Sequence, residues 1–591
     1  MPLRNLTKEQ YDAATYDENL LLTACPGSGK TKTLVAKIAY KLQEQNLGKK
    51  FLVAITYTNV AADTITDRLD SFSIPSDNLW IGTIHSFCLE WIIKSYKGLS
   101  SRTSRGYRLI DQYEAQDILD LIKKNLNLNS YERVNTKLNP DGTIYQHGVS
   151  QSSFLAAEQY HNHLSENKLI DFDLILTIAA TILVEHPNIA LRLSHLFDSI
   201  FVDEYQDTNQ TQYSIMREIL KHGNTKICLI GDIDQAIYTG LGAVVKNQSE
   251  ICQEFSLPQI QVMTLSGCFR SKQEIIDFYS EFQDQKISIQ SQQNKIFPKE
   301  VLSYNRTTQK ADLAEAISAI VKDYLALGVP PNEIAILHPQ WHEVTALGRA
   351  ISQILPNTPF DAPGLSPVPH CHENIWYKLI RLHHLEINNK NYNKRIRLGT
   401  EILRQLSEIG FNIDNTTHTI RSLLKASNSI SITEPGVIEY VRSLILAFCS
   451  NLKININDHK DSLEQYESLI KATNSRIIKD GIDTDPKNLK KYFNESTGVK
   501  ITTCHSTKGE EYQVVICAGL LEGKIPHWDE IINQQHAYSA YMAKRLLYVI
   551  SSRAKASLHL FSEKGIYTVS KKEYIPTKQL SLVARKLNLQ P

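Results

Sequence analysis

Short apolar runs alternate with amphipathic segments along this chain, and most of the runs end in polar residues. The runs at Leu20–Thr23, Phe51–Thr56 and Ser199–Val202 are short and almost uniformly apolar, so they predict strands buried on both faces. Behind the first run, apolar residues recur at the spacing of a helix with one buried face, at Leu34, Val35, Ile38, Ala39 and Leu42. Strands that alternate with such helices predict an α/β fold with a parallel sheet.

A tight turn joins the first strand to its helix and carries residues suited to binding phosphate. The turn reads Ala24-Cys25-Pro26-Gly27-Ser28-Gly29-Lys30-Thr31-Lys32. Gly27 and Gly29 allow backbone N–H groups to point inward, and such a nest at the positive end of a helix holds phosphate. Lys30 is then expected to reach the β- and γ-phosphates, and the Thr31 hydroxyl to bind Mg²⁺. Ala24 replaces the first glycine of the G-x-x-x-x-G-K-[ST] pattern, but the turn still predicts an ATP or GTP site.

Acidic and amide residues follow two later strands and predict the rest of a hydrolytic site. Asp203 and Glu204 end the run that begins at Ser199; Asp203 is expected to hold Mg²⁺ and Glu204 to activate water as a general base. Gln235 follows the strand at Ile227–Gly231 and can touch the γ-phosphate. Upstream of the turn, Gln10 can pair with the N6/N7 edge of adenine, or can simply face solvent at the start of a helix.

Aromatic and polar residues after two other strands suggest contacts with a nucleic-acid strand. Because the carboxyl ends of parallel strands meet at one sheet edge, these residues are expected to lie together. They could stack a base and hold the phosphates of a single strand, or they could be strand-end caps. They are Tyr57, Thr58, Asn59, Thr83 and His85.

Composition limits the class of protein without choosing the partner. A chain of 591 residues implies about three to five domains or subdomains, and 42% apolar with 21% charged residues is ordinary for a globular protein. The nine cysteines are scattered without a C-x-x-C pair, and no apolar run is long enough to span a membrane, which favours a reducing, cytoplasmic setting. The net charge of +1 means that any nucleic-acid site must concentrate its positive charge in a groove.

The order of these motifs resembles superfamily 1 DNA helicases of the UvrD/Rep/PcrA family. In the first half the matching segments are Gln10, Ala24–Thr31, Thr56–Asn59, Thr83–Phe87, Val202–Thr208 and Gly231–Tyr238. In the second half they are Cys268–Ser271, Glu333–Leu337, Thr503–Tyr512, Leu521–His527 and Arg545–Ala554. The matching segments keep one order along nearly the whole chain.

The resemblance implies two RecA-like P-loop domains, each a parallel sheet flanked by helices and each with a mainly helical insertion. The implied segments are a first domain at 1–94 and 171–260 with an insertion at 95–170, and a second domain at 261–364 and 498–591 with an insertion at 365–497. The first domain would bind ATP. Hydrolysis would drive 3′→5′ movement on single-stranded DNA and unwinding of tailed duplexes.

The resemblance also implies roles for residues far from the phosphate turn. Phe269 would stack on the adenine whose edge Gln10 would read. Arg270 and Arg553 would reach the γ-phosphate, an arginine finger contributing roughly 10³–10⁵ in rate. Glu511 would join the ATP contacts. Tyr238 and His505 would join Tyr57, Thr58, Asn59, Thr83 and His85 along the DNA path.

Some positions depart from the family pattern and leave a second function open. Gly240 and Leu241 stand where the family has an aromatic residue and an arginine, which weakens the expected grip on DNA. Only 591 − 553 = 38 residues follow Arg553, so we expect any nuclease to be a separate chain. Compact chains of this kind resemble the GajB-like helicase subunit of Gabija antiviral systems, which works beside an OLD-family nuclease. The alternative is therefore a DNA- or nucleotide-sensing ATPase subunit of such a complex. A zinc site at His370-Cys371-His372 is disfavoured, since no second pair of ligands is evident.

Overall fold

The computed structural model describes all of the chain except residues 1–2, 45–46, 73, 75–76, 130–131, 133, 140, 145–149, 240–241, 285, 362–365, 370, 415, 481–484, 495–496, 528–530, 532–535, 569 and 590–591. The chain divides into two compact units. Unit 1 comprises Met1–Phe87, Leu183–Ala362 and Thr497–Pro591, and unit 2 comprises Cys88–Ile182 and Pro363–Ser496.

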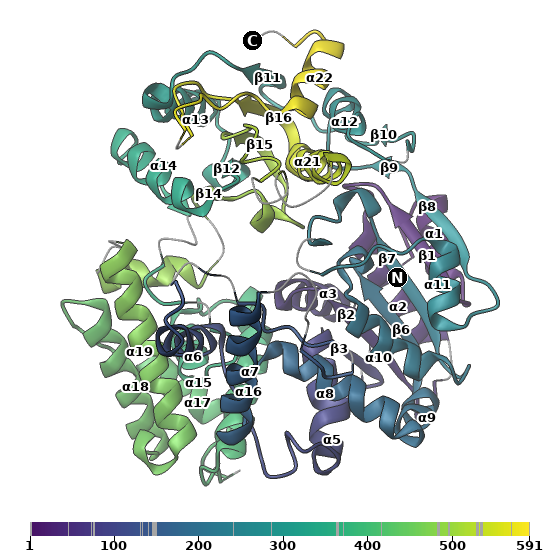
Figure 1. The fold of residues 1–591 in the computed structure, drawn as a ribbon, viewed down its shortest axis with the longest axis vertical. Coiled ribbons are helices and arrows are strands. Elements are labelled where there is room, and N and C mark those ends of the chain that lie inside the picture. Colours follow the sequence, from purple (N-terminus) through teal and green to yellow (C-terminus); the bar gives the residue numbers. More distant parts are fainter. Residues whose placement is uncertain are drawn as a thin grey trace. The chain divides into compact units, whose positions relative to one another are not determined.

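The first half of unit 1 is built on a six-stranded parallel sheet (Figure 1). Its strand order is β3-β2-β6-β7-β1-β8. The strands are β1 (Leu20–Ala24), β2 (Phe51–Thr56), β3 (Leu79–Thr83), β6 (Phe197–Asp203), β7 (Lys226–Gly231) and β8 (Gln261–Leu265). The central strands are buried almost throughout, as expected for apolar runs covered by helices on both faces.

Helices connect these strands, and several begin just after the carboxyl end of a strand. They are α1 (Lys8–Thr15), α2 (Lys30–Glu44), α3 (Asn59–Ser71), α4 (Ile84–Phe87), α9 (Pro187–Leu196), α10 (Gln210–Leu220) and α11 (Gln248–Phe255), with short 3₁₀ helices at Tyr205–Asp207 and Ile233–Gln235. The carboxyl ends of β1, β2, β3, β6 and β7 therefore lead directly into the predicted site residues.

The second half of unit 1 repeats the plan with another six-stranded parallel sheet. Its order is β11-β16-β15-β12-β14-β13. The strands are β11 (Val301–Asn305), β12 (Ile334–His338), β13 (Phe360–Asp361), β14 (Val499–Thr503), β15 (Tyr512–Cys517) and β16 (Ala554–Phe561). The accompanying helices are α12 (Gln273–Ser280), α13 (Leu313–Ala326), α14 (Trp341–Ile354), α21 (His536–Ser551) and α22 (Lys578–Lys586), and β9 (Gly267–Cys268) pairs with β10 (Gln290–Ser291) outside the sheet.

Unit 2 is mainly helical. From the segment Cys88–Ile182 it takes a π-helix (Cys88–Ile93), α5 (Lys94–Tyr96), α6 (Gln112–Asn125), α7 (Gln151–Glu166) and most of α8 (Phe172–Glu185), with the short pair β4 (Arg108–Leu109) and β5 (Leu169–Ile170). From the second insertion it takes α15 (Ile375–His384), α16 (Asn389–Ile409), α17 (Ile420–Ser429), α18 (Val437–Leu452) and α19 (Lys460–Asp480). Its core includes the fully buried Trp376.

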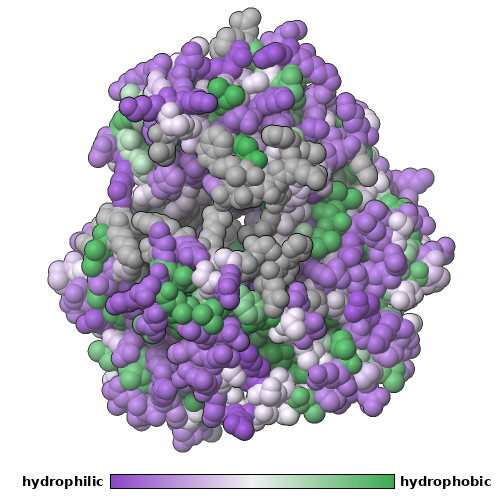
Figure 2. Space-filling model, in the orientation of Figure 1, coloured by the Kyte–Doolittle hydropathy of each residue, from purple (hydrophilic) through white to green (hydrophobic). Residues whose placement is uncertain are grey.

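The predicted fold class is confirmed: two parallel-sheet α/β domains carry mainly helical insertions. The six-segment division remains a prediction, and the structure adds that the two insertions together form one compact unit. On the face shown in Figure 2, hydrophilic residues predominate and apolar residues lie in small groups.

Candidate active site

The turn between β1 and α2 has the backbone of a phosphate nest. Gly27 and Gly29 have φ angles of +72° and +82°, a region that residues with a Cβ rarely adopt. At Gly27 a Cβ would also come within 2.5 Å of the Arg270 Cβ. Because α2 begins at Lys30, the nest lies at the positive end of a 15-residue helix.

The turn's lysine is paired with the proposed general base. Lys30 Nζ lies 3.3 Å from both carboxylate oxygens of Glu204. Burial alone would raise the pKa of Glu204, but the ammonium groups of Lys30 and Lys508 lower it below its ordinary value. Burial and the adjacent Glu204 charge raise the pKa of Asp203 instead. The site thus favours the charged carboxylate of Glu204 and disfavours the charged form of Asp203.

The backbone at Glu204 is in a conformation that is costly for a side chain of this size. Its φ and ψ of 56° and 46° lie in the left-handed region. Such outliers persist where surrounding contacts fix them, and they concentrate at functional sites. Gln206 supplies one such contact, because its Nε2 donates to Glu204 Oε2 at 2.5 Å while its Oε1 accepts the backbone N–H of Asp232 at 3.1 Å.

Gln235 connects this group to the second sheet. Its Nε2 donates to Asp232 Oδ2 at 2.7 Å, and its Oε1 accepts from Arg553 Nη2 at 2.5 Å. Arg553 is 1% exposed and also donates from Nε to the Val549 carbonyl at 3.0 Å. Burial and the nearby positive charge of Arg270 lower the pKa of Arg553 to about 10. Gln235 and Arg553, both predicted to reach the γ-phosphate, are therefore in direct contact.

Arg270 and Phe269 bring the second domain against the phosphate turn. The Phe269 backbone N–H donates to the Gly27 carbonyl at 2.9 Å. Arg270 donates from Nε to Glu511 Oε2 at 2.8 Å and from Nη1 to the Ser552 carbonyl at 2.9 Å. The Phe269 side chain is 41% exposed, which leaves ring surface for stacking.

Gln10 is buried rather than solvent-facing, so the alternative of an exposed helix-start glutamine is wrong. It is 1% exposed, and its Oε1 accepts the Thr7 backbone N–H at 3.1 Å in a capping box of α1. Its Nε2 donates to the Ser28 carbonyl of the phosphate turn at 2.8 Å. A nucleotide base read by Gln10 would therefore be linked directly to the turn; the adenine role itself stays a prediction.

The donor set of Thr31 and Asp203 fits Mg²⁺. Thr31 is the second residue of α2, and Asp203 ends β6 with 6% of its surface exposed. Mg²⁺ takes oxygen ligands. A divalent cation would stabilise the charged carboxylate of Asp203, which burial and the Glu204 charge disfavour.

The predicted DNA residues fall into two groups. Tyr57 and Tyr238 stack, with ring centroids 5.3 Å apart and planes at 17°, and Tyr57 is 47% exposed. Tyr238 OH also donates to the His505 carbonyl at 3.4 Å. By contrast, Thr58 Oγ1 caps α3 by accepting the Ala61 N–H at 3.2 Å, so it does serve as a cap.

The remaining DNA candidates lie at the same sheet edges. Thr83 Oγ1 accepts the Ser86 backbone N–H at 3.3 Å, so it too serves as a cap, while Asn59 is the exposed first residue of α3. Burial lowers the pKa of His85 to about 4 and also lowers that of His505, so both rings are neutral at pH 7. Neutral imidazoles can hydrogen-bond or stack but supply no charge to a phosphate.

A buried ion pair between the two sheets was not predicted. Lys508 Nζ contacts both Asp207 oxygens, at 2.8 and 2.6 Å, and donates to the Gln235 carbonyl at 2.8 Å. Its ammonium lies 5.2 Å from the Tyr238 ring centroid. Asp207 and Lys508 both lie inside recognised motifs, but only the fold reveals that they meet. Lys508 thus contacts both Gln235, a predicted ATP residue, and Tyr238, a predicted DNA residue.

Comparison with known proteins decides the family. A model of the UvrD/REP helicase N-terminal domain matches residues 6–256, and one of the UvrD-like helicase C-terminal domain matches residues 382–565. The chain belongs to the UvrD/Rep helicase family. It is 24% identical to the ATP-dependent DNA helicase PcrA of Staphylococcus aureus, over 94% of this chain and 83% of PcrA. It is also 26% identical to the ATP-dependent DNA helicase srs2 of Schizosaccharomyces pombe, over 92% of this chain and 70% of srs2.

Two sequence features of this UvrD/Rep-family chain, the departure after Tyr238 and the disfavoured zinc segment, include residues that the structure does not describe. Gly240, Leu241 and His370 lie outside the described residues. Of the disfavoured zinc segment, Cys371 is buried and His372 packs its ring against Tyr377 at 5.5 Å. Within the described ranges, no group of three or more His, Cys, Asp or Glu side chains is arranged to hold a metal.

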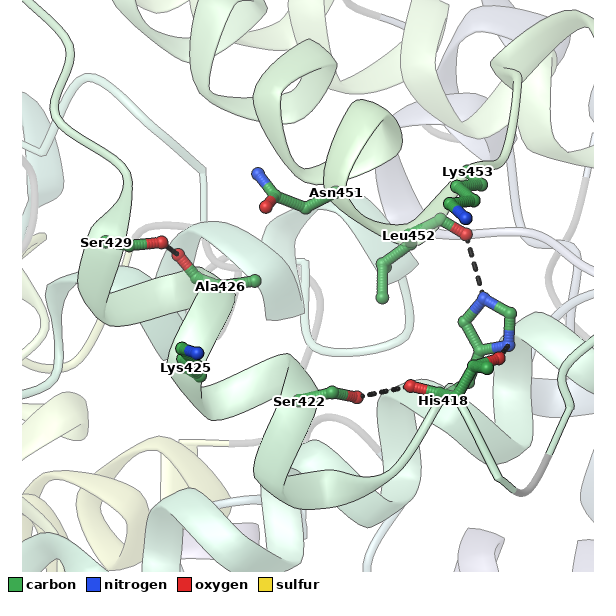
Figure 3. Close-up of a pocket in the computed structure, with 9 residues that line it drawn as sticks. His418, Ser422, Lys425, Ala426, Ser429, Asn451, Leu452 and Lys453 are labelled. Atoms are coloured by element: carbon green, nitrogen blue, oxygen red, sulfur yellow. Dashed lines mark hydrogen bonds between the residues drawn. The ribbon is translucent and has the colours of Figure 1, made fainter.

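The helicase also has a polar pocket in unit 2, of about 380 Å³, shown in Figure 3. It lies between α17 and the end of α18, with Lys425 and Lys453 among its lining residues. His418 Nε2 hydrogen-bonds the Leu452 carbonyl at 2.9 Å, and its Nδ1 accepts the Asp414 N–H at 3.0 Å. One ring nitrogen thus caps the carboxyl end of α18 and the other binds the loop before α17, which marks His418 as structural.

Among the described helices of this family member, none is by itself long and apolar enough to cross a membrane; α8 and α9 satisfy that test only as a bent pair.

Proposed function

We propose that this helicase translocates 3′→5′ along single-stranded DNA and unwinds tailed duplexes, using ATP hydrolysed between its two sheets. Family membership makes the chain an ATP-dependent DNA helicase. The observation that supports hydrolysis between the two sheets is the network in which Gln206 and Asp232 join the Lys30–Glu204 pair to the Gln235–Arg553 pair. The 3′→5′ polarity is inferred from the family resemblance.

The network suggests how nucleotide binding changes the site. Lys30 neutralises Glu204 in this structure, and the phosphates of ATP would compete for its ammonium. As Lys30 turns to the phosphates, Glu204 loses the charge that lowers its pKa and becomes a stronger base for the attacking water. Thr31 and Asp203 would hold Mg²⁺, which when bound neutralises charge on the phosphates.

The contacts between the sheets link hydrolysis to movement. Arg553 and Gln235 meet directly, Phe269 N–H bonds the phosphate turn, and Lys508 reaches the Gln235 carbonyl. Each contact joins a residue of the first sheet's domain to one of the second. A change at the γ-phosphate position would therefore alter bonds that set the spacing of the two sheets, and the aromatic pair Tyr57–Tyr238 adjoins this region.

The test uses ATPase assays followed by unwinding. ATP turnover should rise on addition of single-stranded DNA, and a duplex with a 3′ tail should be unwound while one with only a 5′ tail should not. Unwinding of the 5′-tailed duplex alone would overturn the polarity. Turnover without any unwinding, together with recovery of a nuclease in pull-downs, would instead support the sensing ATPase with a separate nuclease.

A further inference from the structure

One face of helix α21 presents two tyrosines beside the segment that carries Gln235. Tyr538, Tyr541, Met542 and Arg545 are spaced i, i+3, i+4 and i+7, so they share a face. Tyr538 OH donates to Thr239 Oγ1 at 3.1 Å, and Thr239 Oγ1 donates to Met542 Sδ at 3.0 Å. This face of the second domain is therefore in contact with the residue that directly follows Tyr238.

The two tyrosine rings are only partly covered, although the helix around them is buried. Ala543, Leu546 and Leu547 pack in the core, whereas Tyr538 and Tyr541 are half-buried. Their ring centroids are 6.4 Å apart, with planes at 37°. Such a pair leaves aromatic surface available, and Tyr538 is bonded to Thr239, one residue along the chain from the stacked Tyr238.

Arg545 holds this face in place. Its guanidinium lies 3.8 Å from the Tyr541 ring centroid, and its Nη1 donates to the Ala236 carbonyl at 3.1 Å. Arg545 is 2% exposed, so the contact is shielded from solvent. The tyrosine face of α21 is thus tied to the first domain at both Ala236 and Thr239.

Partly exposed aromatic rings are suited to stacking the bases of a single strand without reading sequence. We propose that Tyr538 is a base-stacking residue that extends the Tyr57–Tyr238 platform, so that both domains hold the same strand. This inference rests on the proposed single-strand function. Its structural alternative is that Tyr538 only fills the contact with Thr239.

The experiment measures binding of a fluorescein-labelled oligo(dT) by anisotropy, with the full chain. Tyr538→Ala should weaken binding by about tenfold or more, because base–aromatic stacking is lost. Tyr538→Phe keeps the ring and loses only the hydroxyl bond to Thr239, so its affinity should stay within about twofold of the unmodified chain. Tyr567→Ala, which removes a tyrosine that is 61% exposed in the same unit, is the matched control and should bind normally.

A second oligonucleotide separates stacking from folding. In an oligonucleotide of the same length made entirely of abasic sites, no base can stack, so Tyr538→Ala and the unmodified chain should bind equally. Equal weakening on oligo(dT) and on the abasic strand would overturn the inference, as would a Tyr538→Phe defect as large as that of Tyr538→Ala. If the unmodified chain fails to bind oligo(dT), the proposed function fails; if it binds and Tyr538→Ala matches it, only this inference fails.

Discussion

Arg553 and Gln235 are 318 residues apart in sequence, and Arg553 Nη2 donates to Gln235 Oε1 at 2.5 Å. The bond runs from the turn between α21 and β16 in the second domain to the 3₁₀ helix that follows β7 in the first. Gln235 in turn donates to Asp232, which lies near Lys30. A movement of either residue would break this hydrogen bond and so affect the other.

Arg553→Lys tests whether the guanidinium itself is needed. Lysine keeps the charge but cannot bond Gln235, Val549 and Glu510 together, as Arg553 does. We expect DNA-stimulated ATP turnover to fall by about 10³-fold or more, the range of an arginine finger. Phosphate release at saturating ATP measures this, with Arg585→Lys on the exposed end of α22 as the control. Turnover within about tenfold of the unmodified chain would remove Arg553 from the chemistry.

Glu204→Gln should separate ATP binding from hydrolysis. The amide cannot accept a proton, so turnover should fall by about 10²–10⁴-fold. Binding of a fluorescent ATP analogue should persist, because Lys30 loses its carboxylate partner and remains available for phosphate. Glu254→Gln alters a carboxylate of the same domain that pairs with Lys246 at 2.9 Å, and it should hydrolyse ATP normally. Retained DNA-stimulated ATPase in Glu204→Gln would eliminate the proposed base.

The pair Lys508–Asp207 should contribute strongly to holding the sheets together. Its side chains are 8% and 1% exposed, and removing one partner leaves a buried charge unpaired, which costs about 3–5 kcal/mol. We expect Lys508→Met and Asp207→Asn each to lower the urea midpoint of unfolding. The double variant should lose less free energy of unfolding than the two single variants lose in sum. Lys586→Met breaks an exposed pair with Glu281 and should change stability by less than about 1 kcal/mol. Additive single effects would show that the pair is not coupled.

Much of the site could be predicted because its residues follow short apolar strands. In a parallel sheet the strand ends meet, so Lys30, Glu204 and Gln235 had to lie near one edge. The pattern could not show which polar side chains meet across two sheets. The contacts of Asp207 with Lys508 and of Arg545 with Ala236 depend on how the two domains pack. The spacing of these residues along the chain does not predict that they meet.

Local roles were also hidden from the sequence. Gln10 is a capping-box residue bonded to the phosphate turn, and Thr58 and Thr83 cap backbone N–H groups. A strand-end hydroxyl can satisfy a backbone donor or a phosphate with the same chemistry, so residue type alone leaves both open. The left-handed backbone of Glu204 likewise has no sequence signal, because glutamate rarely adopts it.

Asp234 should make stability depend on pH. Burial and the nearby charge of Asp232 raise its pKa to about 7, although the Asp284 N–H donates to it at 3.0 Å. A carboxyl whose pKa is higher in the folded state stabilises the fold most below its ordinary pKa, and this contribution is lost as pH rises through 7. Asp234→Asn removes the buried charge and keeps a hydrogen-bond acceptor. Its gain in unfolding free energy should therefore be larger at pH 8 than at pH 5, by roughly 1–3 kcal/mol. Urea unfolding at the two pH values measures the difference.

Asp198→Asn is the control. The pKa of Asp198 is lowered by its bonds from Ser199 and Lys41, so the stability that this variant loses should be the same at pH 5 and at pH 8. A gain for Asp234→Asn that does not change between pH 5 and pH 8 would show that Asp234 titrates normally in the folded chain.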